Sequence, residues 1–106
     1  MLQGVVIRGT TPEHKFEIPY DVSLVKNIRV TYGQNGTVHF TKTLSECKLE
    51  NGELSVQLTQ EETFQFIASK KLNIEIRILL TNNKVVRTED PIVLKVIDTI
   101  DTEVMY

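Results

Sequence analysis

The stretch from Leu54 to Leu80 constrains the fold most, because two runs with an apolar residue at every second position flank the start of a short helix. The first run covers residues 54–58 and the second covers residues 72–80. Side chains on a β-strand point alternately to opposite faces, so each run predicts a strand with one buried face. Between the runs, Thr59 and Glu62 have the spacing of a capping box. The stretch therefore predicts a β protein whose chain crosses from one sheet to another through a single capped helical turn.

Turn residues predict two β-hairpins. The segment Gly33–Gly36 contains residues that tolerate positive φ, and it precedes a returning strand at Thr37–Thr43, in which Val38 and Phe40 are expected to face inward. The dipeptide Asn51-Gly52 stands between two apolar positions. Because Asn-Gly favours the tight turns that join antiparallel strands, a second hairpin is expected there.

Several shorter alternating segments complete the predicted set of strands. They lie at Val5–Arg8, Lys15–Ile18, Ile28–Tyr32, Val85–Arg87 and Ile92–Ile97. Short strands at regular spacing with turn residues between them are typical of two packed sheets. We therefore predict an all-β fold, a two-sheet immunoglobulin-like sandwich of about seven or eight mostly antiparallel strands with one short helical turn near residues 60–67. A small barrel is the alternative. Residues 1–97 are predicted to form a single domain, followed by a short acidic tail at 98–106.

Composition argues against several classes of partner. The 106 residues carry 12 Lys and Arg against 14 Asp and Glu, a formal net charge of -2, so no bulk attraction to nucleic acid or anionic membranes is expected. No apolar run approaches the roughly 18 residues that a membrane-spanning helix needs. The first residues lack the basic and apolar segments of a secretory signal, which predicts synthesis and folding in a cytoplasm. The single cysteine, Cys47, agrees with that compartment.

No pattern of catalytic or metal-binding residues is evident. His14 and His39 have no second His or Cys at metal-ligand spacing, and Cys47 has no recognisable partner motif. The adjacent carboxylates Glu61 and Glu62 suit a helix N-terminus better than an acid and base pair. The acidic residues of the tail, Asp98, Asp101 and Glu103, lack the spacing of a calcium loop. We expect no enzymatic activity, no metal and no cofactor.

Candidate interaction residues are few. Tyr20 and Tyr32 are the aromatic residues that could stack on a sugar, although partial burial with the hydroxyl groups in water is the simpler interpretation. The acidic residues Asp98, Asp101 and Glu103 could instead contact a partner protein, or the tail could be frayed. The first and last strands are the expected sheet edges, and an edge presents unpaired backbone groups to which another strand can add.

Motifs along nearly the whole chain resemble those of a known protein family. They are Arg8-Gly9-Thr10-Thr11-Pro12, Phe16-x-Ile18-Pro19, Ile28-Arg29-Val30-Thr31-Tyr32, the stretch from Lys42 to Cys47, Leu58-Thr59-Gln60-Glu61-Glu62-Thr63 and Ile76-Arg77-Ile78-Leu79. This order resembles short proteins of prophages and related mobile elements of Gram-positive bacteria. It is also similar to the N-terminal β-sandwich module of phage baseplate upper proteins, although this sequence ends just after the sandwich.

The resemblance implies a non-enzymatic tail or baseplate component, or a small accessory domain attached to one, made in the bacterial cytoplasm and present in the virion if assembled. The implied partners are other tail or baseplate proteins, or further copies of the chain in a homo-oligomer. The alternative function is a β-sandwich module that binds a carbohydrate or another cell-surface ligand through Tyr20 and Tyr32.

Overall fold

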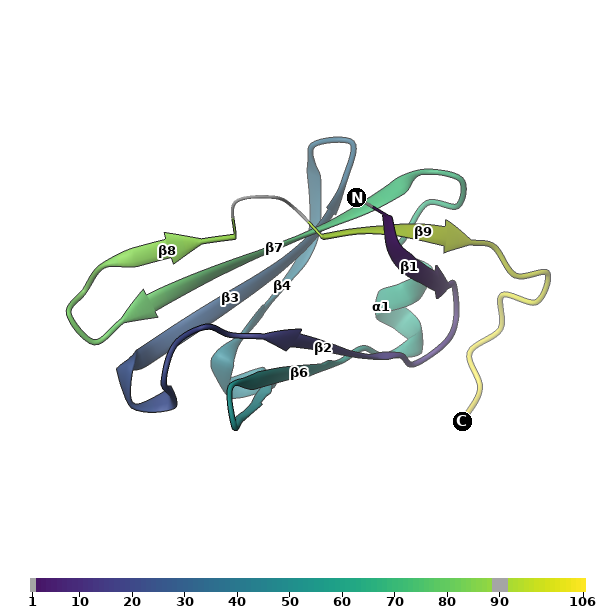
Figure 1. Ribbon diagram of the computed structural model, residues 1–106. Coiled ribbons are helices and arrows are strands. Elements are labelled where there is room, and N and C mark those ends of the chain that lie inside the picture. The colour runs from purple at the N-terminus through teal and green to yellow at the C-terminus, as the bar shows by residue number, and fades with distance from the viewer. Residues whose placement is uncertain (1, 89–91) are drawn as a thin grey trace.

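The computed structural model describes residues 2–88 and 92–106, and its regular secondary structure is mostly β-strand (Figure 1). The strands are β1 (Leu2–Ile7), β2 (Glu13–Glu17), β3 (Val25–Gln34), β4 (Thr37–Thr43), β5 (Lys48–Glu50), β6 (Glu53–Gln57), β7 (Lys71–Leu80), β8 (Val85–Arg87) and β9 (Ile92–Ile97). Two short 3-10 helices, η1 (Val22–Leu24) and η2 (Leu44–Glu46), and one helix, α1 (Gln60–Phe64), connect them.

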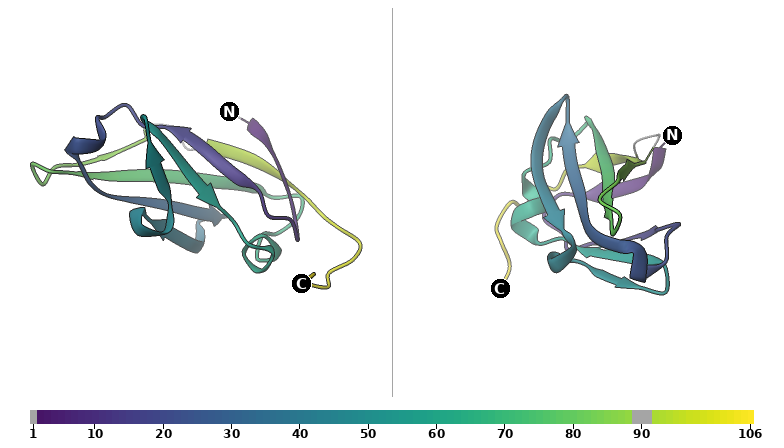
Figure 2. Two further views of the ribbon diagram at one scale, coloured as in Figure 1. Left: turned by 90° about the horizontal axis from the view of Figure 1, so that it is seen from below. Right: turned by 90° about the vertical axis from the view of Figure 1, so that its left-hand side faces the viewer.

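The strands form two sheets that face each other, as Figure 2 shows from two further directions. The larger sheet has the order β1-β9-β7-β3-β4, with β8 also paired to β7, and the smaller sheet has the order β2-β6-β5. All pairs are antiparallel except β1 with β9. The all-β, two-sheet prediction is confirmed. The described residues form nine strands and not the predicted seven or eight. The difference arises because β5 and β8, of three residues each, also pair with neighbouring strands.

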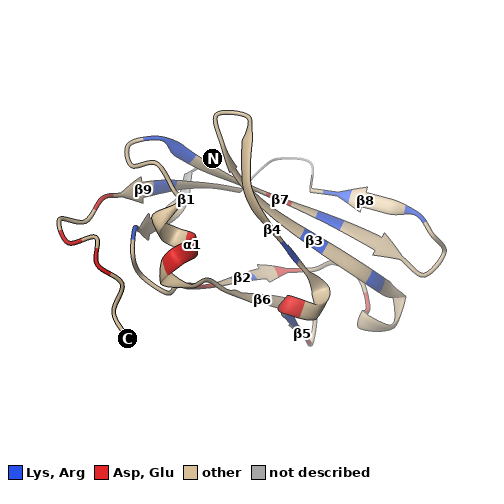
Figure 3. Cartoon of the chain, turned by 180° about the vertical axis from the view of Figure 1, so that it is seen from behind, with Lys and Arg blue, Asp and Glu red and all other residues tan. Residues whose placement is uncertain are grey.

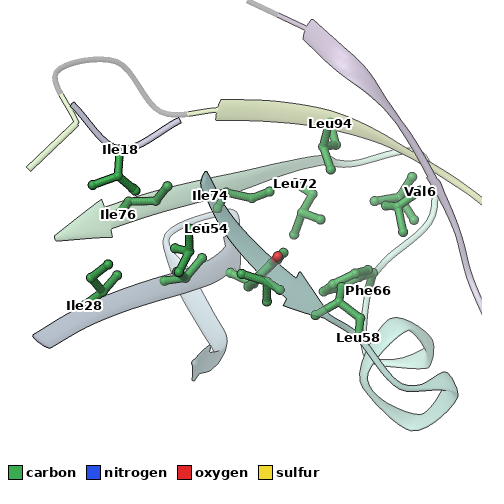
Figure 4. Packing of buried hydrophobic residues seen from close by; sticks show 14 of the residues in the cluster. Val6, Ile18, Ile28, Leu54, Leu58, Phe66, Leu72, Ile74, Ile76 and Leu94 are labelled. Carbon is green, nitrogen blue, oxygen red and sulfur yellow. The ribbon is translucent and has the colours of Figure 1, made fainter. Parts of the chain in front are cut away.

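A single core fills the space between the sheets, and β7 lies at its centre (Figure 4). Its even-numbered residues from Leu72 to Ile78 are buried, Leu80 at its end is half-buried, and most of its odd-numbered residues are exposed, largely as the alternating pattern predicts. The same alternation buries one face of β3 and of β6. The buried apolar residues are Val6, Ile18, Ile28, Val30, Tyr32, Leu54, Val56, Leu58, Phe66, Leu72, Ile74, Ile76, Ile78, Leu94 and Val96.

The predicted capping box forms at the start of α1. The backbone N–H of Glu62 donates to Thr59 Oγ1 at 3.2 Å, and the Thr59 N–H donates to Glu62 Oε1 at 2.9 Å. These bonds satisfy two of the N–H groups that a helix start leaves without partners. The helix ends at Phe64, earlier than the predicted residue 67, and Phe66 just beyond it is buried in the core.

Both predicted hairpins form, but the inward orientation of Val38 was wrong. The turn residues Asn35 and Asn51 adopt positive φ, each followed by a glycine with positive φ. In the first hairpin the register shifts, because Tyr32 lies opposite Phe40 whereas Gly33 lies opposite Val38. The extra residue in β4 turns Val38 to the outer face, where its side chain is 60% exposed. Alternation within β4 alone could not reveal this bulge.

The prediction that the last strand is a sheet edge was wrong as well. Strand β9 lies between β1 and β7, and β1 lies at the edge. The N-terminal strand pairs with β9 in parallel, with Val6 opposite Val96 and Ile7 opposite Ile97. The molecule is elongated, with principal extents of 47, 29 and 20 Å. The hairpin of β7 and β8 lies at one end, and α1 with the C-terminus lies at the other (Figure 1).

Candidate interaction surfaces

The edge strand β1 carries an apolar strip on the outer face of the larger sheet. Among the described strands β1 pairs with β9 alone, so its other side is open except at the Ile7 carbonyl, which accepts from the N–H and Oγ1 of Thr10. The side chains of Val5 and Ile7 are 55% and 43% exposed, and Ile97 lies opposite Ile7 with its side chain also exposed. We call Val5, Ile7 and Ile97 the edge strip. Unpaired backbone groups beside exposed apolar side chains are the features that allow a further strand to add.

Arg8 anchors the end of β1. It contacts Asp98, one of the acidic tail residues predicted to interact with a partner. Arg8 Nη1 lies 2.6 Å from Asp98 Oδ1, and Nη2 donates to the Phe64 carbonyl at 3.1 Å. The guanidinium also lies over the Phe64 ring, 5.7 Å from its centroid. Hydrogen bonds from Arg8 and from the Thr99 amide lower the pKa of Asp98. Asp98 thus ties the start of the tail to the edge strand.

The tail is bonded to α1 through Met105 and leaves most of its side chains in solvent. Gln60 Nε2 donates to the Met105 carbonyl at 2.6 Å, and Gln60 Oε1 accepts from the Met105 N–H at 2.8 Å. The acidic residues Asp101 and Glu103 are exposed, and the Asp101 carboxylate accepts the Glu103 N–H. Three large apolar side chains of the tail are also exposed, those of Ile100, Met105 and Tyr106.

The two tyrosines predicted as stacking platforms do not form one. The Tyr32 side chain is 0% exposed, and its ring stacks on Phe40 at a centroid distance of 4.9 Å. Its hydroxyl lies 2.8 Å from His14 Nδ1 and not in water, and burial raises the pKa of that hydroxyl. Tyr20 is half-buried and packs against the core. Tyr32 was therefore a wrong candidate for ligand stacking, because it lies on the inward face of β3.

Two polar contacts inside the sandwich were not predicted, and both hold elements together. Lys42 Nζ on β4 lies 2.6 Å from Glu62 Oε2 on α1, and both side chains are mostly buried. Gln34, buried on β3, uses its amide to bond Ile67 N–H and carbonyl, the Lys70 carbonyl and the ring of His39. The sequence held one signal for the second contact, because Gln34 is a polar residue at a position of β3 that faces inward. These contacts hold α1 and the loop after it against the larger sheet.

Cys47 is half-buried, and this burial raises the pKa of its thiol. The negative charge of the neighbouring Glu46 carboxylate raises it further. Because the thiolate is the reactive form, this environment favours the unreactive thiol at neutral pH. Within residues 2–88 and 92–106, no three His, Cys, Asp or Glu side chains gather closely enough to hold a metal ion. No helix in this part of the chain is long and apolar enough to span a membrane.

A row of arginines crosses the outer face of the larger sheet. Arg29 on β3 lies opposite Arg77 on β7, and Arg77 lies opposite Arg87 on β8. Arg87 pairs with Glu75 at 2.9 Å, whereas Arg29 and Arg77 form no ion pair with the described residues. Like charges placed directly across a sheet are destabilising. The sequence could not reveal this row, because it depends on the register of three strands.

Beside this row lies a groove of about 190 Å³, which we call the arginine groove. It is lined by Asn27, Ile28, Arg29, Arg77, Leu79 and Val85. Figure 3 shows basic residues on β3, β7, β8 and β9, whereas acidic residues gather on α1, β2 and the C-terminal tail. The groove therefore combines positive charge with apolar walls. Glu75 on β7 pairs with Arg87 beside the row, and other acidic residues lie on α1, β2 and the tail.

No protein-family model matches the chain, and no curated protein shows significant sequence similarity to it.

Proposed function

We propose that this chain is a non-enzymatic interaction module of a phage or prophage particle, a tail or baseplate component that joins neighbouring subunits. The observation that carries this proposal is the open edge of β1 with its exposed edge strip. Such an edge can take a strand from another subunit through main-chain hydrogen bonds.

The backbone of β1 is suited to this role. The Arg8 N–H donates to the Ile97 carbonyl at 3.0 Å, so the N–H of Ile7, one residue earlier, points toward the open side. An added strand could bond to this side of β1 and cover Val5 and Ile7 at the same time. Residues at the end of β1 are held by Arg8 and its contacts with Asp98 and Phe64, which keeps the edge ordered before a partner arrives.

The assignment to a phage particle comes from the sequence resemblance, and we infer with it that the sandwich is of the immunoglobulin-like type. A chain of this size with two sheets of mostly antiparallel strands supports that inference. The alternative, a carbohydrate-binding module, has less support, because the Tyr32 ring has no exposed face.

The particle role is tested by mass spectrometry of particles purified after prophage induction in a strain that carries this gene. We expect the chain at a defined copy number relative to the tail proteins, and its absence from intact particles would contradict the proposal. A strain carrying Val5→Lys and Ile7→Lys tests the edge. Charged residues on an edge strand oppose strand addition, so this chain should fold but be depleted from particles. Lys15→Glu, a charge change on exposed β2, is the control and should leave incorporation unchanged.

A further inference from the structure

We propose that the arginine groove binds the C-terminal segment 98–106 of a second copy of this chain, so that molecules associate head to tail. This inference rests on the proposed function as an interaction module and names one of its partners. It concerns a surface separate from the open edge of β1, so the two can be tested independently.

The groove is suited to a segment that is both acidic and apolar. Arg29 and Arg77 face each other across β3 and β7 on the exposed side of the sheet, so one carboxylate placed between them would relieve their repulsion. Leu79 and the exposed side chain of Val85 provide apolar walls. A small inorganic anion would satisfy the arginines but would leave these walls in water.

The tail has the complementary composition. Asp101 and Glu103 supply carboxylates, and the large side chains of Ile100, Met105 and Tyr106 are exposed in the isolated chain. The tail is also held in place, at Asp98 by Arg8 and at Met105 by Gln60. Ordering a segment before it binds lowers the entropy lost on association. The tail therefore presents both kinds of side chain that the groove would take.

The positions of groove and tail favour contact between molecules. The groove lies toward the end of the molecule formed by β8 and the C-terminal end of β7, whereas the tail lies beside α1 at the opposite end (Figure 1). The molecule is 47 Å long, and Gln60 holds the tail on α1. A contact between opposite ends of identical subunits is heterologous, and it builds a ring or an open row of subunits rather than a closed dimer.

The test is sedimentation velocity of the full chain and two variants. The first variant, Arg29→Glu with Arg77→Glu, keeps the tail but reverses the charge of the groove. The second ends at Thr99, which keeps the Asp98 contact with Arg8 but removes the rest of the tail. The wild type should form assemblies larger than a dimer at about 0.5 mM, and each variant alone should be monomeric. An equimolar mixture of the two should form a dimer and nothing larger, because only one complementary contact remains.

A labelled peptide of residues 98–106 tests the contact directly. Its affinity for the chain that ends at Thr99 should fall at least about tenfold when Arg29→Glu and Arg77→Glu are added, and should weaken with rising salt. Lys15→Glu with Lys48→Glu, the same charge change on the smaller sheet, is the control and should bind as the unaltered chain does.

Three results would overturn this inference. They are equal peptide binding with and without the arginines, equal binding of a scrambled peptide of the same composition, and self-association that persists in both variants alone. The last result would point to the β1 edge and leave the proposed function standing. Absence of the chain from particles, in contrast, would contradict the proposed function even if the peptide binds.

Discussion

The side chain of Gln60 forms two hydrogen bonds with the backbone of Met105, 45 residues later in the chain. Its Nε2 donates to the Met105 carbonyl at 2.6 Å, and its Oε1 accepts the Met105 N–H at 2.8 Å. The side-chain amide of Gln60 thus forms the pair of hydrogen bonds that the backbone of a neighbouring strand would otherwise form with Met105. Because the bonds use only the backbone of Met105, the side chains of the tail stay available to other molecules.

Replacing Gln60 by Ala should release the tail without unfolding the sandwich. We expect the free energy of unfolding to fall by less than about 1 kcal/mol, because the bonds are exposed to water. Protection of the Met105 amide from hydrogen exchange, measured by NMR, should be lost. Gln65→Ala, an exposed residue at the other end of α1, is the matched control. Full protection of Met105 in Gln60→Ala would show that other contacts hold the tail.

Much of the fold follows from patterns that act over a few residues. The strict alternation of β7 predicted a strand with one buried face, because a strand with apolar residues on one face is stable only when that face is covered. The capping box at Thr59 and the turn at Asn51-Gly52 were also predictable, since each depends on residues no more than three positions apart.

The surfaces were harder to predict, because they depend on which strands pair and in which register. Strand β9 became interior through its parallel partner β1, and a one-residue bulge turned Val38 outward. The burial of Tyr32 could have been deduced, since it shares a face with Ile28 and Val30. The row of arginines could not, because it joins residues 29, 77 and 87 across three strands.

The buried amide of Gln34 should be important for stability. Replacing it by Leu leaves the Ile67 N–H and the carbonyls of Ile67 and Lys70 without their partner, and we expect a loss of about 3 kcal/mol in urea unfolding. The control, Asn73→Leu on the outer face of β7, should change stability by less than about 0.5 kcal/mol. Equal stability of the two variants would show that water replaces the lost bonds.

Two glycines with similar positive φ should respond differently to alanine. Gly9 has φ +81, and a Cβ there would lie 2.6 Å from Phe64 Cζ, whereas Gly36 has φ +75 and open space around it. We expect Gly36→Ala to cost about 1 kcal/mol, from the conformation alone, and Gly9→Ala to cost about 3 kcal/mol. Adding Phe64→Leu to Gly9→Ala should recover part of the difference. Equal costs for the two substitutions would mean that the Phe64 ring moves aside freely.

His14 should make the stability depend on pH near neutrality. Burial lowers the pKa of His14 below its ordinary value of 6.5, because the ring packs beside Tyr32 in the sandwich. Above that value the ring is neutral in both the folded and the unfolded chain. As the pH falls below 6.5 the unfolded chain binds a proton first, so the free energy of unfolding decreases until the pH reaches the folded pKa.

Urea unfolding between about pH 7.5 and pH 5.5 measures this decrease, which cannot exceed about 1.4 kcal/mol per pH unit for one group. His14→Gln should flatten the slope, whereas Lys15→Gln, its exposed neighbour on β2, should keep it. Carboxylates with a lowered pKa do not interfere, since hydrogen bonds lower the pKa of Asp98 from 3.8 and that of Glu46 from 4.5. Their stabilisation is lost only at more acidic pH. The same slope in His14→Gln as in the wild type would show that another group binds the proton.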